Sequence, residues 1–553
     1  MTGTRSGARI VVDVLRDEGV RRVFGNPGST ELQLIDAITA SGDIDYVLAL
    51  HEQCVIAMAD GYAQATGRPA FVNLHTMSGL GNAIGALTNA RANGAPLVVT
   101  AGQQHQRMLH ADPLLADDLV AIARPVSKWA HEVRAVEELE VYLRRAFLDA
   151  MTPPRGPVFL SLPWSLMVEE CSGAPLTRSR MDRAAVAGGL DEFADALTQP
   201  APGEVALVLG PEIVHGAAVS QAVALAEAMA APVFGGPIGP VGVYPPAHAC
   251  WRGVLPSTAA ATRARLAGFR RVFHIGGQPF QASSLSEGEP LPEGVELLHL
   301  SPDPYQIGRT CPVALGASGD LRASLDALVP LVRARVDAGA VAQALAAAAV
   351  TRQAQMAQAD ARARDAYGAV PIAAVAAVHA LLDALPEDAV VVDEAVSNSH
   401  HVRALHLWHT PGRMYSGKQI IGWGMPAAVG IALAHERRLP VLCINSDGGA
   451  LFSPQALWSA AHERVPVVFA ILVNNEYGIL KNLLAGVAAG ENRPVAGASV
   501  DLDNPRVDHL ALAAAFGVPA ERVKHAADIG DCVRRAFAAG GPRLVEIPIA
   551  TSR

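Results

Sequence analysis

Short apolar runs rich in valine, isoleucine and leucine recur along the chain between alanine-rich stretches. Runs of this length are typical of strands that are buried on both faces of a parallel sheet. The alanine-rich stretches have the composition of helices that cover those faces. The pattern therefore predicts an α/β fold of doubly wound parallel sheets, with strands at Val47–Leu50, Leu97–Thr100, Val158–Leu162, Val205–Leu209, Val272–Ile275, Val390–Val392, Val441–Ile444 and Val467–Val473.

Two segments interrupt this pattern and have the composition of linkers. Residues 168–186 mix proline, serine, glycine and arginine, and residues 333–368 are rich in alanine, glutamine and arginine, which favours a helix. With 553 residues the chain is also too long for a single hydrophobic core. We therefore expect three doubly wound parallel-sheet domains, at residues 1–168, 187–332 and 366–553.

Composition and charge exclude several classes of partner. The net charge is -9 and the pI is about 6.1, so we expect no nucleic-acid partner and no attraction to an anionic membrane. The six cysteines are scattered without a CxxC pair, which argues against a zinc knuckle or a disulfide framework. We find neither a signal peptide nor an apolar run of membrane-spanning length, so the predicted location is the cytoplasm.

The strongest chemical signal follows two neighbouring predicted strands in the C-terminal third. Ser446, Asp447, Gly448 and Gly449 come after the first strand, and Asn474 and Asn475 come directly after the second. Ligands of parallel α/β sheets bind at the carboxyl ends of the strands, where glycines let the backbone approach a phosphate. Asp447 and Asn474 offer oxygen ligands suited to Mg²⁺, so the sequence predicts a metal-diphosphate site. The alternative is that these residues form only a turn and a helix cap.

Three strand ends in the N-terminal third carry a second set of candidate residues. The Gly25–Ser29 segment predicts a tight turn and then a helix capped by Ser29 or Thr30. Glu52 follows one apolar strand, and His75 ends another. A carboxylate buried at such a position is costly unless it is paired, which indicates chemistry. The alternatives are a helix cap for Ser29, a favourable helix-dipole position for Glu52, and a structural role for His75.

Taken together, these motifs resemble the thiamine-diphosphate-dependent 2-oxo acid decarboxylases, and benzoylformate decarboxylases in particular. The turn Gly-Asn-Pro-Gly-Ser, the strand end Leu-Ala-Leu-x-Glu and the strand end Asn-Leu-His occur there in this order and spacing. The resemblance continues through residues 96–104, 156–163, 422–430 and 456–466. The aspartate-glycine loop followed by asparagine resembles the family's cofactor signature, although Ser446 replaces its usual first glycine.

The resemblance implies pyrimidine-binding, central and diphosphate-binding domains, the cofactors thiamine diphosphate and Mg²⁺, and a homodimer or homotetramer. Glu52 would act on a cofactor held mainly by the partner subunit, and His75 and Ser29 would face the substrate. Ile421 would lie under the bent cofactor, and the Gln419 carbonyl would receive its exocyclic amine. The implied cofactor contacts are Glu52, Ser397, Gln419, Ile421, Asp447, Gly448, Gly449, Asn474, Tyr477, Gly478 and Ile479. The implied Mg²⁺ ligands are Asp447, Asn474 and the backbone carbonyl of Glu476.

The same resemblance predicts a carbon-carbon lyase that converts an aryl or bulky aliphatic 2-oxo acid into an aldehyde and CO₂. Its pocket would include Leu115, Ser283, Tyr415 and Leu483. Ser283 stands where the family has a second active-site histidine and Leu483 where it has an aromatic wall, while Lys418 lies in an otherwise small-residue stretch. Serine cannot store a proton near neutral pH, so slow protonation could favour carboligation. The alternative is that these three positions vary without consequence.

Three other functions stay open on the sequence alone. An acetohydroxyacid synthase-like carboligase would share the cofactor site, although residues 187–329 contain no recognisable FAD site. A catalytically inactive homologue has no physical need for Glu52, Asp447 and Asn474. A nicotinamide enzyme would need a GxGxxG turn opening a helix with an acidic partner downstream, and we find none.

Overall fold

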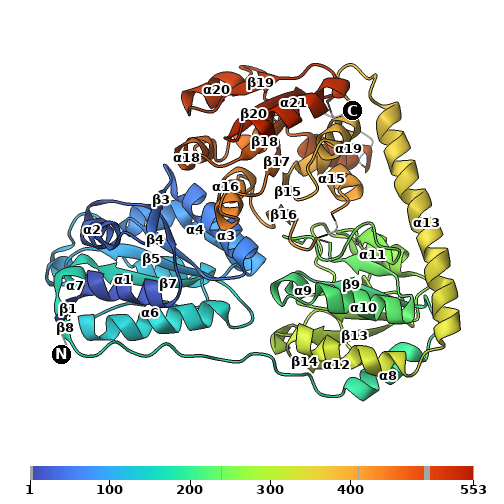
Figure 1. Cartoon of the computed structure of the whole chain (residues 1–553), viewed down its shortest axis with the longest axis horizontal. Helices are drawn as coiled ribbons and strands as arrows, with labels where there is room; N and C mark the ends of the chain where they lie inside the picture. The colour runs from blue at the N-terminus through green and yellow to red at the C-terminus, as the bar shows by residue number, and fades with distance from the viewer. Residues whose placement is uncertain (1–3, 238, 409, 491–498, 552–553) are drawn as a thin grey trace. The chain divides into compact units, whose positions relative to one another are not determined.

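The computed structural model describes residues 4–237, 239–408, 410–490 and 499–551. Their contacts divide the chain into two compact units. The first unit contains residues 1–180, 368–399 and 417–553, and the second contains residues 181–367 and 400–416. The first unit has an N-terminal and a C-terminal sheet, and the second unit has a sheet of its own (Figure 1).

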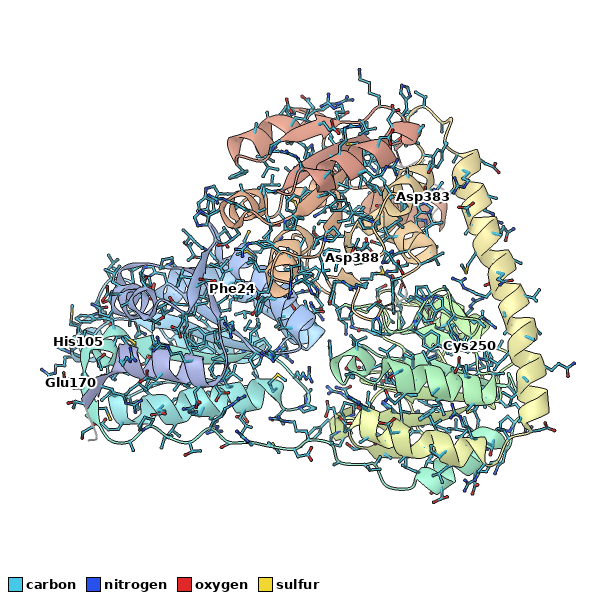
Figure 2. All side chains as sticks on the ribbon, in the orientation of Figure 1. Phe24, His105, Glu170, Cys250, Asp383 and Asp388 are labelled. Carbon is cyan, nitrogen blue, oxygen red and sulfur yellow. The ribbon has the colours of Figure 1, made fainter. Side chains whose placement is uncertain are left out.

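The N-terminal sheet of the first unit is entirely parallel. Helices α1 (Gly7–Asp17), α2 (Leu32–Ser41) and α6 (Val136–Met151) pack together over one face, whereas α3 (Glu52–Thr66) and α4 (Thr76–Asn93) pack against each other (Figure 1). Phe24 is buried in this sheet, with its ring centroid 5.3 Å from that of Tyr62 on α3 (Figure 2). The strand order is β3 (Asp45–Leu48), β2 (Arg22–Asn26), β4 (Ala70–Leu74), β5 (Leu97–Gln103), β7 (Val158–Pro163) and β6 (Ala130–Glu132).

The C-terminal sheet of the first unit follows the same plan. Within this unit its parallel strands follow the order β15 (Val390–Glu394), β17 (Val441–Ser446), β18 (Val467–Val473), β20 (Arg543–Pro548) and β19 (Ala520–Arg522). Helix α16 (Gly424–Ala434) is buried along its length and packs against α3. The two helices approach so closely that a Cβ on Gly430 would lie 1.9 Å from the Met58 carbonyl oxygen. Only glycine fits there, so the sequence itself specifies this helix contact.

The second unit contains a six-stranded parallel sheet with an apolar core on each face. Its helices include α10 (Val219–Met229), α12 (Leu321–Arg333) and the long α13 (Ala338–Asp365), which confirms the helix predicted in residues 333–368. The strand order is β11 (Trp251–Val254), β10 (Val233–Gly235), β9 (Val205–Leu209), β12 (Arg271–Ile275), β13 (Glu296–Ser301) and β14 (Leu315–Ser318).

All eight strands expected from the apolar runs are present and parallel, which confirms the predicted fold class of three parallel-sheet α/β domains. The boundaries at residues 1–168, 187–332 and 366–553 remain predictions. The six cysteines are free, as their spacing predicted, and Cys250 is one that lies buried in the second unit (Figure 2). None of the helices in the described residues combines the length and apolarity needed to cross a membrane.

Candidate active site

A cavity of about 310 Å³ opens at the carboxyl ends of β15, β17 and β18 in the first unit. It is the position that the strand-end argument predicted for the metal-diphosphate site. The cavity brings together most of the predicted cofactor and metal residues. They are Ser397, Ile421, Asp447, Gly448, Gly449, Asn474, Glu476, Tyr477, Gly478 and Ile479.

Asp447, which lines this cavity, is held by backbone donors. One carboxylate oxygen accepts the Gly448 N–H at 2.8 Å, and the other accepts the N–H groups of Asn474 at 3.1 Å and Asn475 at 2.6 Å. Burial raises the pKa of Asp447, whereas these hydrogen bonds favour the ionised form. The carboxylate joins the loops after β17 and β18, so the two predicted metal-binding segments meet.

Ser446 acts as a helix cap inside this site. Its hydroxyl accepts the Gly449 N–H at 3.1 Å and so opens the short helix α17 (Asp447–Ala450). The serine therefore supports the loop turn with its own side chain. A cap here does not exclude a ligand, because the capped loop still lines the cavity.

Val396 at the cavity and Asn475, next to the cavity residue Asn474, hold unusual backbone conformations. Val396 has φ of +51° and Asn475 has φ of +55°. A β-branched residue in the left-handed region is strained, and such strain collects at functional sites. The loop after β18 is also held from outside, since Tyr477 donates its N–H to the Val500 carbonyl at 2.8 Å. Lys481 bridges the carboxylates of Glu476 and Asp501, which fixes Glu476 at the cavity wall.

Glu52 is buried at the first turn of α3, beside the end of β2. Its two carboxylate oxygens accept the side-chain amides of Asn26 at 2.9 Å and Asn82 at 3.0 Å. The helix is capped by His51, whose Nδ1 accepts the Gln53 N–H, so Glu52 itself is not needed as the cap. Glu52 does not line the cavity of its own chain in the described residues.

His75 forms a hydrogen-bonded group with two residues from the neighbouring strand end. Its Nδ1 lies 2.9 Å from a carboxylate oxygen of Glu31, which is itself 1% exposed, and 3.3 Å from the Thr30 hydroxyl. A carboxylate partner assigns the proton to Nδ1 and leaves Nε2 as an acceptor. A Cβ on Gly28 would lie 2.2 Å from the imidazole, so glycine is required for the ring to sit there. Strand order thus places His75 after β4 and Glu52 after β3, the two strands on either side of β2.

The predicted cap at Ser29 or Thr30 is wrong. The helical turn Ser29–Glu31 begins with the Glu31 carboxylate accepting the Gly28 N–H at 2.8 Å, while Ser29 is exposed. Thr30 instead donates to Glu31. Glutamate replaces the hydroxyl cap because its longer side chain can reach back to Gly28 and also bind His75.

The remaining predicted residues do not line the cavity in the described part of the chain. Leu115 lies in the first unit with a strained φ of +72°, and Leu483 is exposed on α19 (Gly478–Gly490). Gln419 is exposed on the segment before α16. Ser283 and Tyr415 belong to the second unit, so their pocket roles remain predictions.

Sequence reasoning missed Glu394, which organises one side of the site. One of its oxygens accepts the N–H groups of Gly422 and Trp423, both at 2.9 Å, and the other accepts those of Gly424 and the Asn445 side chain, both at 3.0 Å. Burial raises the pKa of Glu394 to about 7, against the effect of these four donors. The signal was present, because Glu394 ends an apolar strand just as Asp447 follows one.

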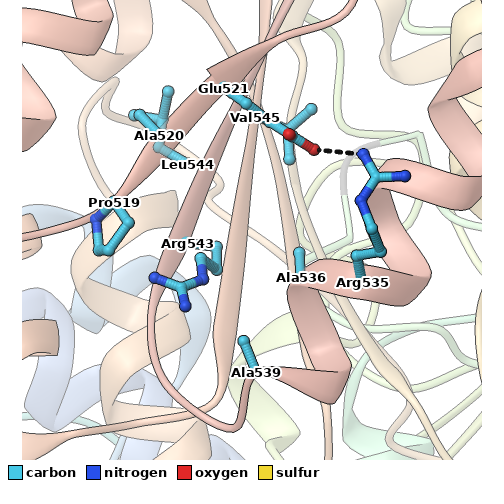
Figure 3. A pocket seen from close by; sticks show the side chains of 9 residues that line it. All are labelled: Pro519, Ala520, Glu521, Arg535, Ala536, Ala539, Arg543, Leu544 and Val545. Carbon is cyan, nitrogen blue, oxygen red and sulfur yellow. Dashed lines mark hydrogen bonds and ion pairs between the residues drawn. The ribbon is translucent and has the colours of Figure 1, made fainter.

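A second cavity of about 270 Å³ lies at the outer edge of the C-terminal sheet, between β19, β20 and α21 (Ala526–Ala538) (Figure 3). Arg535 on its wall is paired with Glu521 at 3.0 Å. This cavity offers few polar groups to a ligand, since most of its other lining residues are apolar. None of the residues predicted for the site lines it.

Comparison with known proteins relates three parts of the chain to the same enzyme family. Residues 5–122 match the N-terminal TPP binding domain of thiamine pyrophosphate enzymes, residues 191–328 match their central domain and residues 396–547 their C-terminal TPP binding domain. The chain belongs to the thiamine pyrophosphate enzyme family. Members of this family bind thiamine diphosphate together with Mg²⁺.

Three relatives place the chain within the family. A benzoylformate decarboxylase from Pseudomonas aeruginosa is 35% identical over 98% of both chains. The structure of a thiamine diphosphate-dependent 4-hydroxybenzoylformate decarboxylase from Rhodococcus jostii is 30% identical over 99% of both chains, with a TM-score of 0.88. A glyoxylate carboligase from Escherichia coli is 27% identical over 95% of this chain and 89% of its own.

The residues of the main cavity fit a magnesium-bound diphosphate. Asp447, Asn474 and Glu476 provide oxygen atoms, which are the donors that Mg²⁺ prefers. In the described residues no group of three or more His, Cys, Asp or Glu side chains could hold a metal ion by itself. A metal bound by these oxygens would take its remaining ligands from phosphate oxygens and water.

Proposed function

We propose that the protein decarboxylates a 2-oxo acid with an aryl or bulky aliphatic side chain, giving an aldehyde and CO₂. The observation that carries the proposal is the combination of the Asp447 cavity with the two strand ends that hold Glu52 and His75. The names of the two decarboxylases described above support benzoylformate-like substrates. The cofactor and metal residues keep the roles that the resemblance gave them.

The cofactor would be held by the loops of the C-terminal sheet. Asp447, Asn474 and the Glu476 carbonyl would bind Mg²⁺, and the glycines of the Asp447 loop would face the diphosphate. Ile421 and the Gln419 carbonyl would contact the rings. Thiamine diphosphate supplies the electron sink that accepts the bonding pair when CO₂ leaves.

Glu52 and His75 would carry the proton chemistry. Both Glu52 oxygens are fixed by amide donors, so this carboxylate can exchange a proton with the pyrimidine ring without reorienting. Glu31 accepts the Nδ1 proton of His75, so Nε2 is the nitrogen that would exchange a proton with the substrate. Ser29 is exposed and would bind the substrate carboxylate through its hydroxyl.

The proposed site is shared between two copies of the chain. Glu52 does not line the cavity of its own chain among the described residues, and apolar side chains that line the cavity are exposed, including Phe452, Ile479 and Leu480. A second copy that covers these side chains would bring its own Glu52 to the cofactor. We therefore propose a homodimer as the smallest active species, or a tetramer of two such dimers.

Product analysis tests this proposal against the carboligase alternative. With benzoylformate, thiamine diphosphate and Mg²⁺ we expect benzaldehyde to account for most of the substrate consumed. Added acetaldehyde is expected to divert only a minor fraction into 2-hydroxyketone. Chromatography of both products decides the matter. Hydroxyketone as the main product, even without added aldehyde, would establish a carboligase and contradict the proposed decarboxylase.

A further inference from the structure

The segment Gly417–Trp423 has no secondary structure of its own, although it carries Gln419 and Ile421. Its backbone N–H groups are bound instead by two buried side chains from distant parts of the chain. Glu394 accepts those of Gly422 and Trp423, as described above. At the other end, Asn89 on α4 accepts those of Lys418 at 2.9 Å and Gln419 at 2.8 Å with one side-chain oxygen.

The orientation of Asn89 is set by Asp60 on α3. Asp60 accepts the Asn89 amide at 3.3 Å, so the Asn89 oxygen faces the two N–H groups of the segment. Asp60 also accepts the side chains of Gln64 at 2.7 Å, Asn93 at 2.9 Å and Trp423 at 2.8 Å. Asp60, Asn89 and Trp423 are all fully buried, so none of these groups can exchange its partner for water.

We propose that Asn89 is a positioning residue, held by Asp60, that fixes the backbone of Lys418 and Gln419 and so places Gln419 and Ile421 at the cofactor. The hydrogen bonds that fix the segment all lie within one copy of the chain. The consequence for the cofactor rests on the proposed function. The N-terminal domain then does more than supply Glu52, because its helices α3 and α4 also shape the cofactor segment of the same chain. Gln53, next to Glu52, adds a third contact by donating to the Ile421 carbonyl at 3.2 Å.

Asn93 provides a matched control for Asn89. Both asparagines lie buried on α4 and donate to the same Asp60 oxygen. Only Asn89 accepts from the segment, whereas the Asn93 oxygen has no hydrogen-bond partner in the described structure. N89A and N93A therefore remove the same kind of side chain, but only N89A frees the N–H groups of Lys418 and Gln419.

The first measurement is amide hydrogen exchange on the full-length, cofactor-free protein. In N89A we expect the amides of Lys418 and Gln419 to exchange at least about tenfold faster than in the wild type, because each loses the Asn89 oxygen that accepts its N–H. In N93A the same amides should stay within about twofold of the wild type. Unchanged exchange in N89A, or an equal increase in both variants, would overturn the proposal.

The second measurement is calorimetric titration with thiamine diphosphate in excess Mg²⁺. We expect N89A to raise the Kd at least about tenfold, which corresponds to about 1.4 kcal/mol, and N93A to change it by less than about threefold. Faster exchange in N89A with an unchanged Kd would overturn the cofactor role of Asn89. Failure of the wild type to bind the cofactor would instead defeat the proposed function, and the exchange result would still stand.

One further variant protects the test against misfolding. N89S removes the amide oxygen with a smaller loss of polarity and replaces N89A if that variant is not recovered folded. We expect folded N89S to show faster exchange at Lys418 and Gln419 as well. Wild-type exchange at both amides in folded N89S would overturn the proposal.

Discussion

Glu52→Gln is expected to lower kcat by about 10²- to 10⁴-fold while leaving the affinity for thiamine diphosphate nearly unchanged. The two Glu52 oxygens accept amide protons from Asn26 and Asn82, so the carboxylate is held ready for proton exchange. Glutamine keeps the size of the side chain but cannot take or release a proton near neutral pH. Steady-state kinetics measure the loss, and calorimetry measures cofactor binding.

Glu52→Asp is the matched control, because it keeps the charge and shortens the side chain by one methylene. We expect it to retain more activity than Glu52→Gln. In Glu52→Gln one amide donor faces another, which costs about 1–3 kcal/mol of folding free energy. Thermal melting therefore has to show that the variant is folded at the assay temperature. Wild-type turnover in folded Glu52→Gln would remove Glu52 from the mechanism.

Asp447→Asn is expected to abolish the binding of Mg²⁺ and thiamine diphosphate, and with it turnover. Asp447 is a buried carboxylate that joins the loops after β17 and β18, and its charge is what a divalent cation requires. A ligand at one hundred times its Kd stabilises a folded protein by about 2.7 kcal/mol. Adding both cofactors should therefore raise the melting temperature of the wild type but not that of Asp447→Asn.

Asp508→Asn is the control for the loss of a carboxylate in the same domain. Asp508 caps helix α20 (His509–Ala515) with its side chain, and asparagine is an equally good cap. This variant should keep the full cofactor-induced shift. Mixing Asp447→Asn with Glu52→Gln tests sharing between subunits, since a hybrid dimer would contain one intact site and regain activity. A cofactor-induced shift in Asp447→Asn equal to that of the wild type would contradict the role of Asp447.

The fold was largely predictable because each strand is marked by the residues of its own short segment. Strands buried on both faces need continuous apolar runs, and β9 and β18 have the very bounds expected from theirs. Parallel pairing then brings strand ends together, which is why Asp447 and Asn474 meet at one cavity. The same logic places Glu52 and His75 at one edge of the N-terminal sheet, after the strands on either side of β2.

The contacts that position these residues could not be read from the sequence. Asn89 lies more than three hundred positions from Lys418, and Glu394 reads as one more residue at the end of a strand. Their roles arise only when helices and loops pack, and no local pattern marks them. Ser29 shows the converse error, because a hydroxyl beside a turn predicts a cap, whereas Glu31 reaches back and takes the Gly28 N–H.

Release of CO₂ from benzoylformate and branched aliphatic 2-oxo acids, with thiamine diphosphate and Mg²⁺ supplied or withheld, tests the central claim most directly. We expect one CO₂ for each 2-oxo acid consumed, with the fastest release from an aryl or bulky aliphatic acid. Release should fall to background when either cofactor is withheld from protein first freed of both. A protein that binds the cofactors yet releases no CO₂ from any of these acids would contradict the proposed function.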